Sequence, residues 1–333
     1  MWEDSEIEQQ LEQKLNQRGS NGKALYARYI AARTVLNKEI LPWIRSVEGS
    51  LTDHGPDHIR NVLDNAYQLI GPNSDLNDIE LYILCQSILF HDVGNLFGRD
   101  RHNLNISQVH TKIFSELWRS RQEMSLVISI GRSHSGKSLV DGSKDTLKDL
   151  KNDFYESTNV RAQQLAAILR FADELAEGPQ RTSAFLINSH KFHPDSQIYH
   201  MYASATHVGI DRGGDRIALS YHIELDKFNF TDPAGIDEFT KFMKCIYSRV
   251  HKLDGERRYC KHYCDLLNPY KRTSVSFSFW SDDHQIDLMV EPFELDDLFV
   301  PGSDLKDIEK VFPNYDIEKM VLRIKQMKGS HDE

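Results

Sequence analysis

The residues of this sequence best suited to chemistry are histidines and aspartates set beside apolar segments. His91 and Asp92 end a run from Ile79 to Val93 that is apolar almost all round. An ionised carboxylate at the end of a buried helix is strongly unfavourable unless it is paired or bound to a metal ion. Asp173 is placed in the same way at the end of the apolar segment Leu165 to Leu175, and His58 adjoins a third apolar stripe.

Two imidazoles and two carboxylates on three separate helices could converge on one divalent ion. This mixed set of nitrogen and oxygen donors suits iron, manganese, zinc or magnesium. A metal ion held there would lower the pKa of a water molecule and polarise a phosphoryl oxygen. The residue types therefore favour metal-assisted hydrolysis of a phosphate ester.

The first half of the chain is expected to form the helices that position these side chains. Apolar residues recur with helical spacing from Ile59 to Ile70, after a Gly55-Pro56 pair that places His58 in the first turn. The apolar run is expected to form a central buried helix that carries His91 and Asp92 in its last turn and is stopped by Gly94. The Leu165 segment is expected to form another core helix.

The pattern changes after about residue 185. Apolar residues alternate from Ile217 to Ile223, and the preceding Gly213-Gly214 turn makes the stretch from Tyr199 to Ile210 the expected hairpin partner. A second hairpin is expected from Val275 to Val290. A helix from Phe239 to Leu253 lies between the hairpins, and a helical tail lies near residues 317–324. We therefore predict two parts, residues 1–185 and an α+β accessory region of residues 186–333 packed on the first.

The composition limits the classes of partner. The 333 residues include 50 acidic and 40 basic ones, a net charge of −10, so the overall field attracts neither nucleic acid nor an anionic membrane. The acidic N-terminus and the lack of a long apolar run predict a cytoplasmic protein without a membrane partner. Four cysteines give no disulfide framework, which fits a reducing compartment. Self-association into a homo-oligomer is left open.

The phrases DHGPDHIRNVL, ILFHDVGNL and LRFADEL, over roughly residues 50 to 185, resemble the HD superfamily of metal-dependent phosphohydrolases. The resemblance is closest to the branch associated with bacterial conflict systems, called HD-CE. It implies a mainly α fold, an HD/PDEase-like helical bundle, here with an α+β C-terminal extension of hairpins and helices. It also implies that His58, His91, Asp92 and Asp173 bind the catalytic metal.

Branches of this superfamily with a second metal use extra histidines, and here His102 and His134 are the best placed, with His110 in reserve. One or two ions of Mn, Fe, Mg, Zn, Ni or Co are expected. We expect His54 to cap the helix or support a ligand rather than bind the metal. Three basic residues are candidates for holding substrate phosphates: Arg132, Arg181 and Lys137. Asn95 departs from the lysine that many HD enzymes carry, and the Gly-Tyr-Pro signature of cyclic-di-GMP phosphodiesterases is absent.

A competing pattern runs from Gly131 to Ser138, GRSHSGKS, and matches the P-loop of nucleotide triphosphatases letter for letter. A P-loop needs a strand before it, here Leu126 to Ile130, and a long helix after it. Asp141, Gly142 and Ser143 favour a turn instead of that helix. The P-loop is therefore kept as the weaker alternative.

The sequence thus predicts a metal-dependent phosphohydrolase of the phosphodiesterase, nucleotidase or nuclease type, acting on a nucleotide or nucleic-acid phosphoester. A role in a conflict or anti-phage system follows from the resemblance alone. The alternatives are a non-catalytic nucleotide-binding or signalling HD module and a P-loop NTPase.

Overall fold

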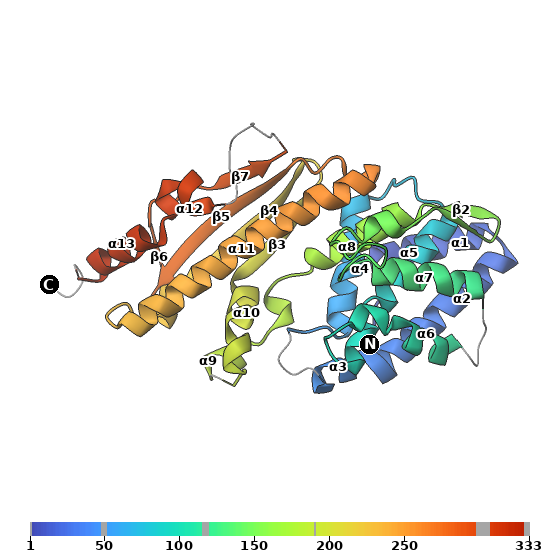
Figure 1. Ribbon diagram of the computed structural model, residues 1–333, viewed down its shortest axis with the longest axis horizontal. Coiled ribbons are helices and arrows are strands. Elements are labelled where there is room, and N and C mark those ends of the chain that lie inside the picture. Colours follow the sequence, from blue (N-terminus) through green and yellow to red (C-terminus); the bar gives the residue numbers. More distant parts are fainter. Residues whose placement is uncertain (1, 48–51, 115–119, 190, 298–306, 330–333) are drawn as a thin grey trace. The chain divides into compact units, whose positions relative to one another are not determined.

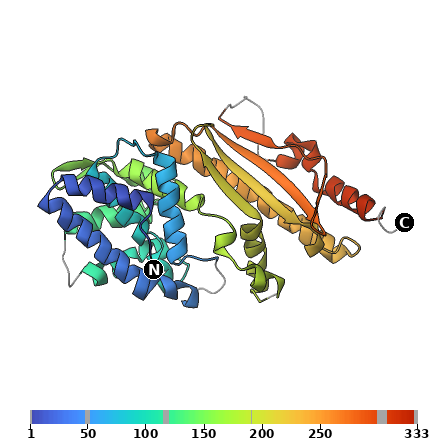
Figure 2. The same ribbon diagram turned by 180° about the vertical axis from the view of Figure 1, so that it is seen from behind.

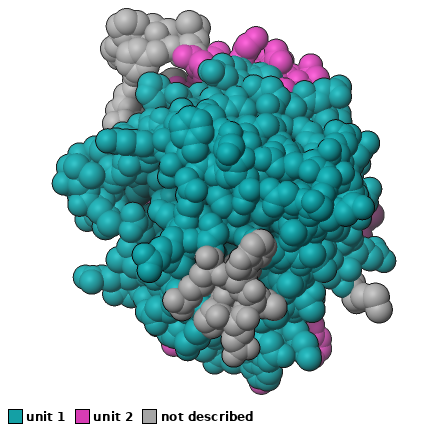
Figure 3. Space-filling model, turned by 90° about the vertical axis from the view of Figure 1, so that its right-hand side faces the viewer, with its two compact units in different colours: residues 1–176, 259–269 teal, residues 177–258, 270–333 magenta. Residues whose placement is uncertain are grey.

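The computed structural model describes residues 2–47, 52–114, 120–189, 191–297 and 307–329. The chain forms two compact units, which Figure 3 shows in different colours. Unit 1 comprises Met1–Ala176 and Tyr259–Pro269, and unit 2 comprises Glu177–Arg258 and Tyr270–Glu333. The boundary predicted after residue 185 lies beyond the change of unit at Glu177, and as a division into domains it stays a prediction.

Unit 1 is a bundle of helices with one small hairpin (Figure 1). It also contains the end of the long helix α11 (Pro233–Tyr263) and the turn η7 (Asp265–Leu267). Its other elements are, in chain order, α1 (Glu6–Gln17), α2 (Ser20–Val35), η1 (Leu36–Ile40), α3 (Leu41–Val47), α4 (Pro56–Ile70), α5 (Asp78–Phe90), η2 (Val93–Phe97), η3 (His102–Leu104), α6 (Ile106–Phe114), α7 (Arg121–Arg132), η4 (Leu147–Asp149), β1 (Asp153–Tyr155), β2 (Thr158–Val160) and α8 (Ala162–Glu174).

Helix α5 is the centre of unit 1, as its sequence predicted. Every residue from Ile79 to Phe90 is buried, and the helix packs against α1, α2, α4, α7 and α8. A capping box starts it, in which the Asn77 side chain accepts from the Glu80 amide and the Glu80 carboxylate accepts from the Asn77 amide. Because α5 is surrounded by other helices, the residues that follow its last turn are held deep in the unit.

Unit 2 contains a mixed sheet and further helices. Figure 2 shows the strands in front of α11, so this helix covers one face of the sheet. A contact between the rings of Tyr247 on α11 and Phe277 on β5 joins the two layers. The elements of unit 2 besides α11 are η5 (Pro179–Arg181), α9 (Ala184–Asn188), α10 (Pro194–Ala205), β3 (Thr206–Asp211), β4 (Arg216–Glu224), η6 (Leu225–Lys227), β5 (Arg272–Ser281), β6 (His284–Ile286), β7 (Phe293–Asp296), α12 (Ile308–Val311), η8 (Pro313–Tyr315) and α13 (Ile317–Gly329).

The sheet has the order β3-β4-β5-β6, and β7 pairs with β5. The two central strands β4 and β5 run parallel, with Leu219 opposite Val275 and Tyr221 opposite Phe277. Parallel neighbours need a crossover connection, and α11 provides it. The predicted alternation in β4 is confirmed, and both predicted hairpins form, β3 with β4 and β5 with β6, but the β4–β5 pair joins them in one sheet.

Two details of the predicted hairpins were wrong. Residues Pro194–Ala205 are helical, so only Thr206–Asp211 pairs with β4. The apolar alternation after Ile286 does not continue as a strand, because Met289 adopts a left-handed backbone with φ of 56°. The mainly α architecture with an α+β C-terminal part is confirmed.

Candidate metal centre

His58 is positioned by the start of α4. Gly55 is the N-cap and Pro56 the first helical residue, as expected, so His58 lies in the first turn. Its side chain is fully buried. The Asn65 side chain, about two turns later, donates to the Ala172 carbonyl at 3.0 Å. This bond holds α4 against the part of α8 that carries Asp173.

His91 and Asp92 lie just beyond α5 rather than in its last turn. The helix ends at Phe90, and His91 is the C-cap with helical backbone angles of −59° and −37°. The expectation that the helix continues to Val93 and stops at Gly94 was wrong, because a 3-10 turn, η2, follows Asp92 directly. Gly94 has another role: a Cβ atom there would lie 1.8 Å from the His102 carbonyl oxygen.

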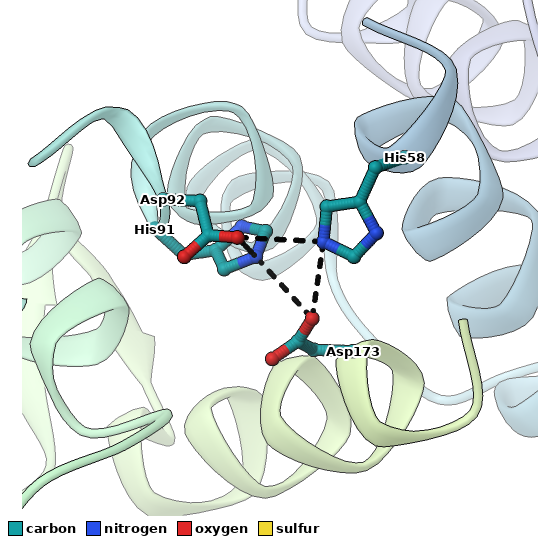
Figure 4. A group of neighbouring side chains, drawn as sticks. All are labelled: His58, His91, Asp92 and Asp173. Atoms are coloured by element: carbon teal, nitrogen blue, oxygen red, sulfur yellow. Dashed lines mark ion pairs between the residues drawn. The ribbon is translucent and has the colours of Figure 1, made fainter. Parts of the chain in front are cut away.

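Four side chains converge as the spacing predicted, and Figure 4 shows them. The Nε2 atom of His58 lies 3.2 Å from Oδ1 of Asp173 and 3.5 Å from Oδ2 of Asp92. The Nε2 atom of His91 lies 3.5 Å from the same Asp92 oxygen and 3.6 Å from Asp173 Oδ1. One ligand atom from each residue falls within 4.8 Å of the others, so this group, the His/Asp cluster, could hold a metal ion.

A second group shares Asp92 with the first. The Nε2 atoms of His102 and His134 lie 3.5 and 3.6 Å from Oδ1 of Asp92, and 3.2 Å from each other. These three residues also satisfy the distance pattern of a metal site. The two oxygens of one carboxylate therefore face two different sets of histidines.

The backbone sets the orientation of three of these imidazoles. The Nδ1 atoms of His91, His102 and His134 each lie within hydrogen-bond distance of a carbonyl oxygen three residues earlier in the chain. A carbonyl only accepts, so each Nδ1 carries the proton and each Nε2 keeps its lone pair when the ring is neutral. This arrangement, with Nδ1 donating to the backbone and Nε2 toward the centre, is the usual one for metal-binding histidines.

The electrostatics of the cluster follow from two buried carboxylates among histidines. Burial opposes the ionisation of Asp92 and Asp173, yet the neighbouring histidines hold the pKa of each carboxyl well below its usual range. Burial likewise opposes protonation of His91, but Asp92 and Asp173 raise its pKa to about 10. Burial lowers the pKa of His134 to about 3, so this ring is neutral. The carboxylates are charged and attract a cation.

The other predicted site residues have different settings. His54 Nε2 lies 3.9 Å from Asp92 Oδ2 while its Nδ1 approaches the Thr52 carbonyl at 2.6 Å. His110 is outside both groups and packs against the ring of Phe90. Arg181 belongs to unit 2, where it pairs with Glu177 at 3.4 Å.

The P-loop alternative is contradicted by the local structure. Residues Arg121–Arg132 form α7, so the segment that would be the preceding strand is helical. Lys137 is exposed, Arg132 is half-buried at the end of α7, and the chain turns at Ser138–Gly142 instead of starting a helix.

The glycines of this segment serve the histidine group instead. Gly131 places α7 against the His91 backbone, where an added Cβ would be at ordinary contact distance, 3.6 Å from that Cα atom. Gly136 has a φ of +83°, which favours glycine. Asn103 donates to the carbonyls of Arg132 and Ser135, both at 3.2 Å, and so fixes the loop that carries His134.

Sequence reasoning had treated Asn95 only as a departure from relatives. In the structure it is fully buried, and its Nδ2 atom donates to Oδ1 of Asp92 at 3.0 Å. The available signal was its position three residues after Asp92 in a tight turn, which brings the two side chains to one side.

Comparison with known families now bears on this geometry. The HD-CE family model matches residues 48–231, more than half of the chain, and the match includes all the residues of both histidine groups. The chain belongs to the HD-CE family. Comparison with curated proteins and comparison with solved structures each gave no match. Within the described residues, no helix is both long and apolar enough to cross a membrane.

Proposed function

We propose that this HD-CE protein is a metal-dependent phosphohydrolase that acts on a nucleotide or nucleic-acid phosphoester. The observation that supports this most is the Asp92 carboxylate, whose Oδ2 faces His58 and His91 while its Oδ1 faces His102 and His134. A carboxylate between two sets of imidazoles is suited to bridging two metal ions, and two-metal sites are common in phosphoester hydrolysis.

The residues present fit such ions. His58 Nε2 and His91 Nε2 are buried and make no hydrogen bond of normal geometry among the described residues. Buried polar atoms rarely stay without a partner, so an ion that displaces the proton held on His91 could take both nitrogens as ligands. With two carboxylates and four imidazoles, the donor set suits Mn, Fe, Zn, Ni or Co, and less well the all-oxygen preference of Mg.

A divalent ion bound there would act as a Lewis acid on a phosphoryl oxygen and would lower the pKa of a water molecule. The chain itself controls access. Side-chain exposure is 24% for Asp173 but at most 3% for His58, His91 and Asp92. Within the His/Asp cluster, Asp173 is therefore the residue that solvent reaches most easily.

Asp173 also has a free carboxylate oxygen for the reaction. Its Oδ1 atom faces the two imidazoles, while Oδ2 points away from them (Figure 4). We assign to Oδ2 the orientation of the attacking water, because an ionised carboxylate accepts hydrogen bonds at both oxygens.

The biological setting is proposed from family membership: defence against phage or another bacterial conflict, in the cytoplasm. The reaction class rests on the geometry of the cluster and would hold in another setting.

Metal analysis followed by a phosphate-release screen over nucleotides and oligonucleotides tests the proposal. Protein purified without added metal should retain one or two equivalents of a transition metal and release phosphate from at least one phosphoester. The double substitution His91→Ala, Asp92→Ala should remove bound metal and lower the rate by several orders of magnitude, whereas Lys137→Ala should keep its metal.

Three results would argue against the proposal. An active, metal-free double mutant would exclude the cluster from catalysis. A metal-loaded protein that turns over no phosphoester would favour a nucleotide-binding module. A Lys137→Ala variant that keeps its metal but loses all activity would move the chemistry away from the cluster.

A further inference from the structure

An exposed apolar surface adjoins the two histidine groups. It lies on α3, η2 and η3, of which η2 packs against the other two. Four large apolar side chains on these segments are exposed, and we call them the apolar rim: Trp43 (57%), Val47 (51%), Phe97 (44%) and Leu104 (38%).

Two of the three rim segments adjoin metal-binding candidates. Asp92 immediately precedes η2, and His102 is the first residue of η3. Few residues of chain therefore separate the rim from Asp92 at η2 and from His102 at η3. Single exposed apolar residues are ordinary on protein surfaces, but several gathered on segments that line a reactive centre indicate binding.

Arg99 connects this surface to the metal centre. Its guanidinium NH1 donates to Oδ1 of Asn95 at 3.3 Å, and Asn95 in turn donates to Asp92. The Arg99 carbonyl lies 3.1 Å from Nδ1 of His102. Arg99 is nevertheless exposed, so its guanidinium can meet a ligand from solution while its position is fixed by two hydrogen bonds to the centre.

Arg99 contacts the second histidine group in two ways, through its side chain by way of Asn95 and through its backbone carbonyl directly at His102. A guanidinium this close to the centre is well placed for an anion that approaches it, because its planar fork matches the oxygens of a phosphate.

We propose that Arg99 and the aromatic rings of the apolar rim form the substrate-recognition site, where Arg99 binds the phosphate and Phe97 and Trp43 stack on the base of a nucleoside phosphate. The inference rests on the proposed phosphohydrolase function and names the residues that select its substrate. Aromatic side chains are effective base-stacking platforms, and any base offers a π face to them.

The charge balance favours a nucleoside phosphate over a long strand. Among the described residues of α3 and of the stretch from η2 to η3, the exposed basic side chains are Arg45, Arg99 and Arg101, and Asp100 offsets one of them. The whole chain carries −10. Proteins that bind nucleic-acid strands without sequence preference neutralise many phosphates with a basic groove. One or two phosphates match the charge available here.

Calorimetric titration of the full-length, Mn²⁺-loaded protein tests the assignment without requiring turnover. The probes are AMP, ribose 5-phosphate and inorganic phosphate, and metal content is measured on every sample. AMP should bind about tenfold or more tightly than ribose 5-phosphate, since stacking on an aromatic ring contributes on this order per base. Phe97→Ala and Trp43→Ala should each reduce that preference and leave ribose 5-phosphate binding unchanged.

Arg99→Ala should weaken all three probes together, by about 10- to 100-fold for a lost charge-assisted hydrogen bond. Lys23→Ala removes an exposed positive charge on α2 and is the matched control. It should leave the binding of all three probes unchanged. All variants should keep their metal, which separates a failed recognition site from a failed metal centre.

Three outcomes would overturn the proposal. One is equal binding of AMP and ribose 5-phosphate by the metal-loaded protein. Another is a lack of effect of the substitutions, either on the AMP preference in both aromatic variants or on phosphate binding in Arg99→Ala. A third is binding of single-stranded oligonucleotides that is far tighter than AMP and steeply salt-dependent, which would assign the surface to a strand instead.

Discussion

Asn95 donates its side-chain amide to the oxygen of Asp92 that faces His102 and His134. The Nδ2 to Oδ1 distance is 3.0 Å, and both residues are buried. The amide is neutral, so it fixes the carboxylate without competing as a cation for the charge that a metal ion would neutralise. Where many HD enzymes have a lysine, this chain has a group that orients the acid.

Replacing Asn95 with leucine should weaken metal binding. We expect a loss of about 10- to 100-fold in affinity, the usual effect of removing a hydrogen bond that orients a metal ligand. Competition with a fluorescent chelator measures it. Asn21→Leu is a matched control, because Asn21 also donates its amide to a carboxylate, Glu156 at 2.8 Å, but on the surface. Equal affinities in both variants would show that Asn95 does not position Asp92.

His102 and His134 should be needed for the second ion only. Their Nε2 atoms face Oδ1 of Asp92, whereas His58 and His91 face Oδ2. In protein that holds two equivalents of metal, His102→Ala or His134→Ala should reduce the content toward one, as measured by inductively coupled plasma analysis.

His110→Leu should keep both ions, since His110 packs on Phe90 away from the centre. Unchanged stoichiometry in the His102 and His134 variants would limit the protein to a single ion.

The free energy of unfolding should fall in mild acid because of His110. Burial lowers the pKa of its imidazole from 6.5 to about 4. Between these values the unfolded chain binds a proton that the folded chain does not, so stability is lost as the pH falls through this window. From pH 7 to pH 5 the loss should be about 2 kcal/mol.

Urea unfolding of metal-stripped protein at both pH values measures this loss. In His110→Leu, the stability lost between pH 7 and pH 5 should be smaller by about 2 kcal/mol. The contribution of the His/Asp cluster to the pH dependence should remain. If His110→Leu and the unsubstituted protein lose the same stability between pH 7 and pH 5, the imidazole is not kept neutral by burial.

Gly94 should tolerate no side chain. An added Cβ would lie 1.8 Å from the His102 carbonyl oxygen, a backbone atom, so η2 and η3 would have to separate. We expect Gly94→Ala to destabilise the protein by about 3 kcal/mol, as overpacking does, and to weaken metal binding at His102.

Gly255→Ala is the contrasting control. Gly255 lies within α11 with no atom within 4 Å of its Cβ position, so alanine should stabilise the helix by up to about 1 kcal/mol. Thermal unfolding should show a lower melting temperature for Gly94→Ala and a higher one for Gly255→Ala. A neutral Gly94→Ala would mean that the turn can widen without cost.

The four residues of the His/Asp cluster were found from sequence because their signals are local. A histidine in the first turn after Gly55-Pro56 and acids at the ends of apolar helices stand out in the periodicity alone. The exact end of α5 could not be found in this way. The apolar residues Phe90 and Val93 flank His91 and Asp92, and nothing in this stretch marks where the α-helix ends and the 3-10 turn begins.

Tertiary structure decided which other histidines join the centre. The sequence put His102 and His134 ahead of His110, but the reason is tertiary: His102 and His110, only eight positions apart, separate because η3 turns one toward Asp92 and α6 turns the other onto Phe90. Two contacts support this arrangement. Gly94 lies against the His102 backbone, and Asn103 donates to the carbonyl of Ser135, which is distant in the sequence.

In the sheet of unit 2, too, the sequence predicted local features and the tertiary structure decided how they pair. Alternation identified β4 and β5 as strands, and β4 buries every second side chain while β5 buries Thr273, Val275 and Phe279 on one face. Their parallel pairing depends on a crossover through α11, which lies between them in the chain and covers one face of the sheet. The alternation of a strand is a property of its own residues. The strand that it pairs with depends on how the whole unit buries its apolar faces, so the pairing is decided only by the tertiary structure.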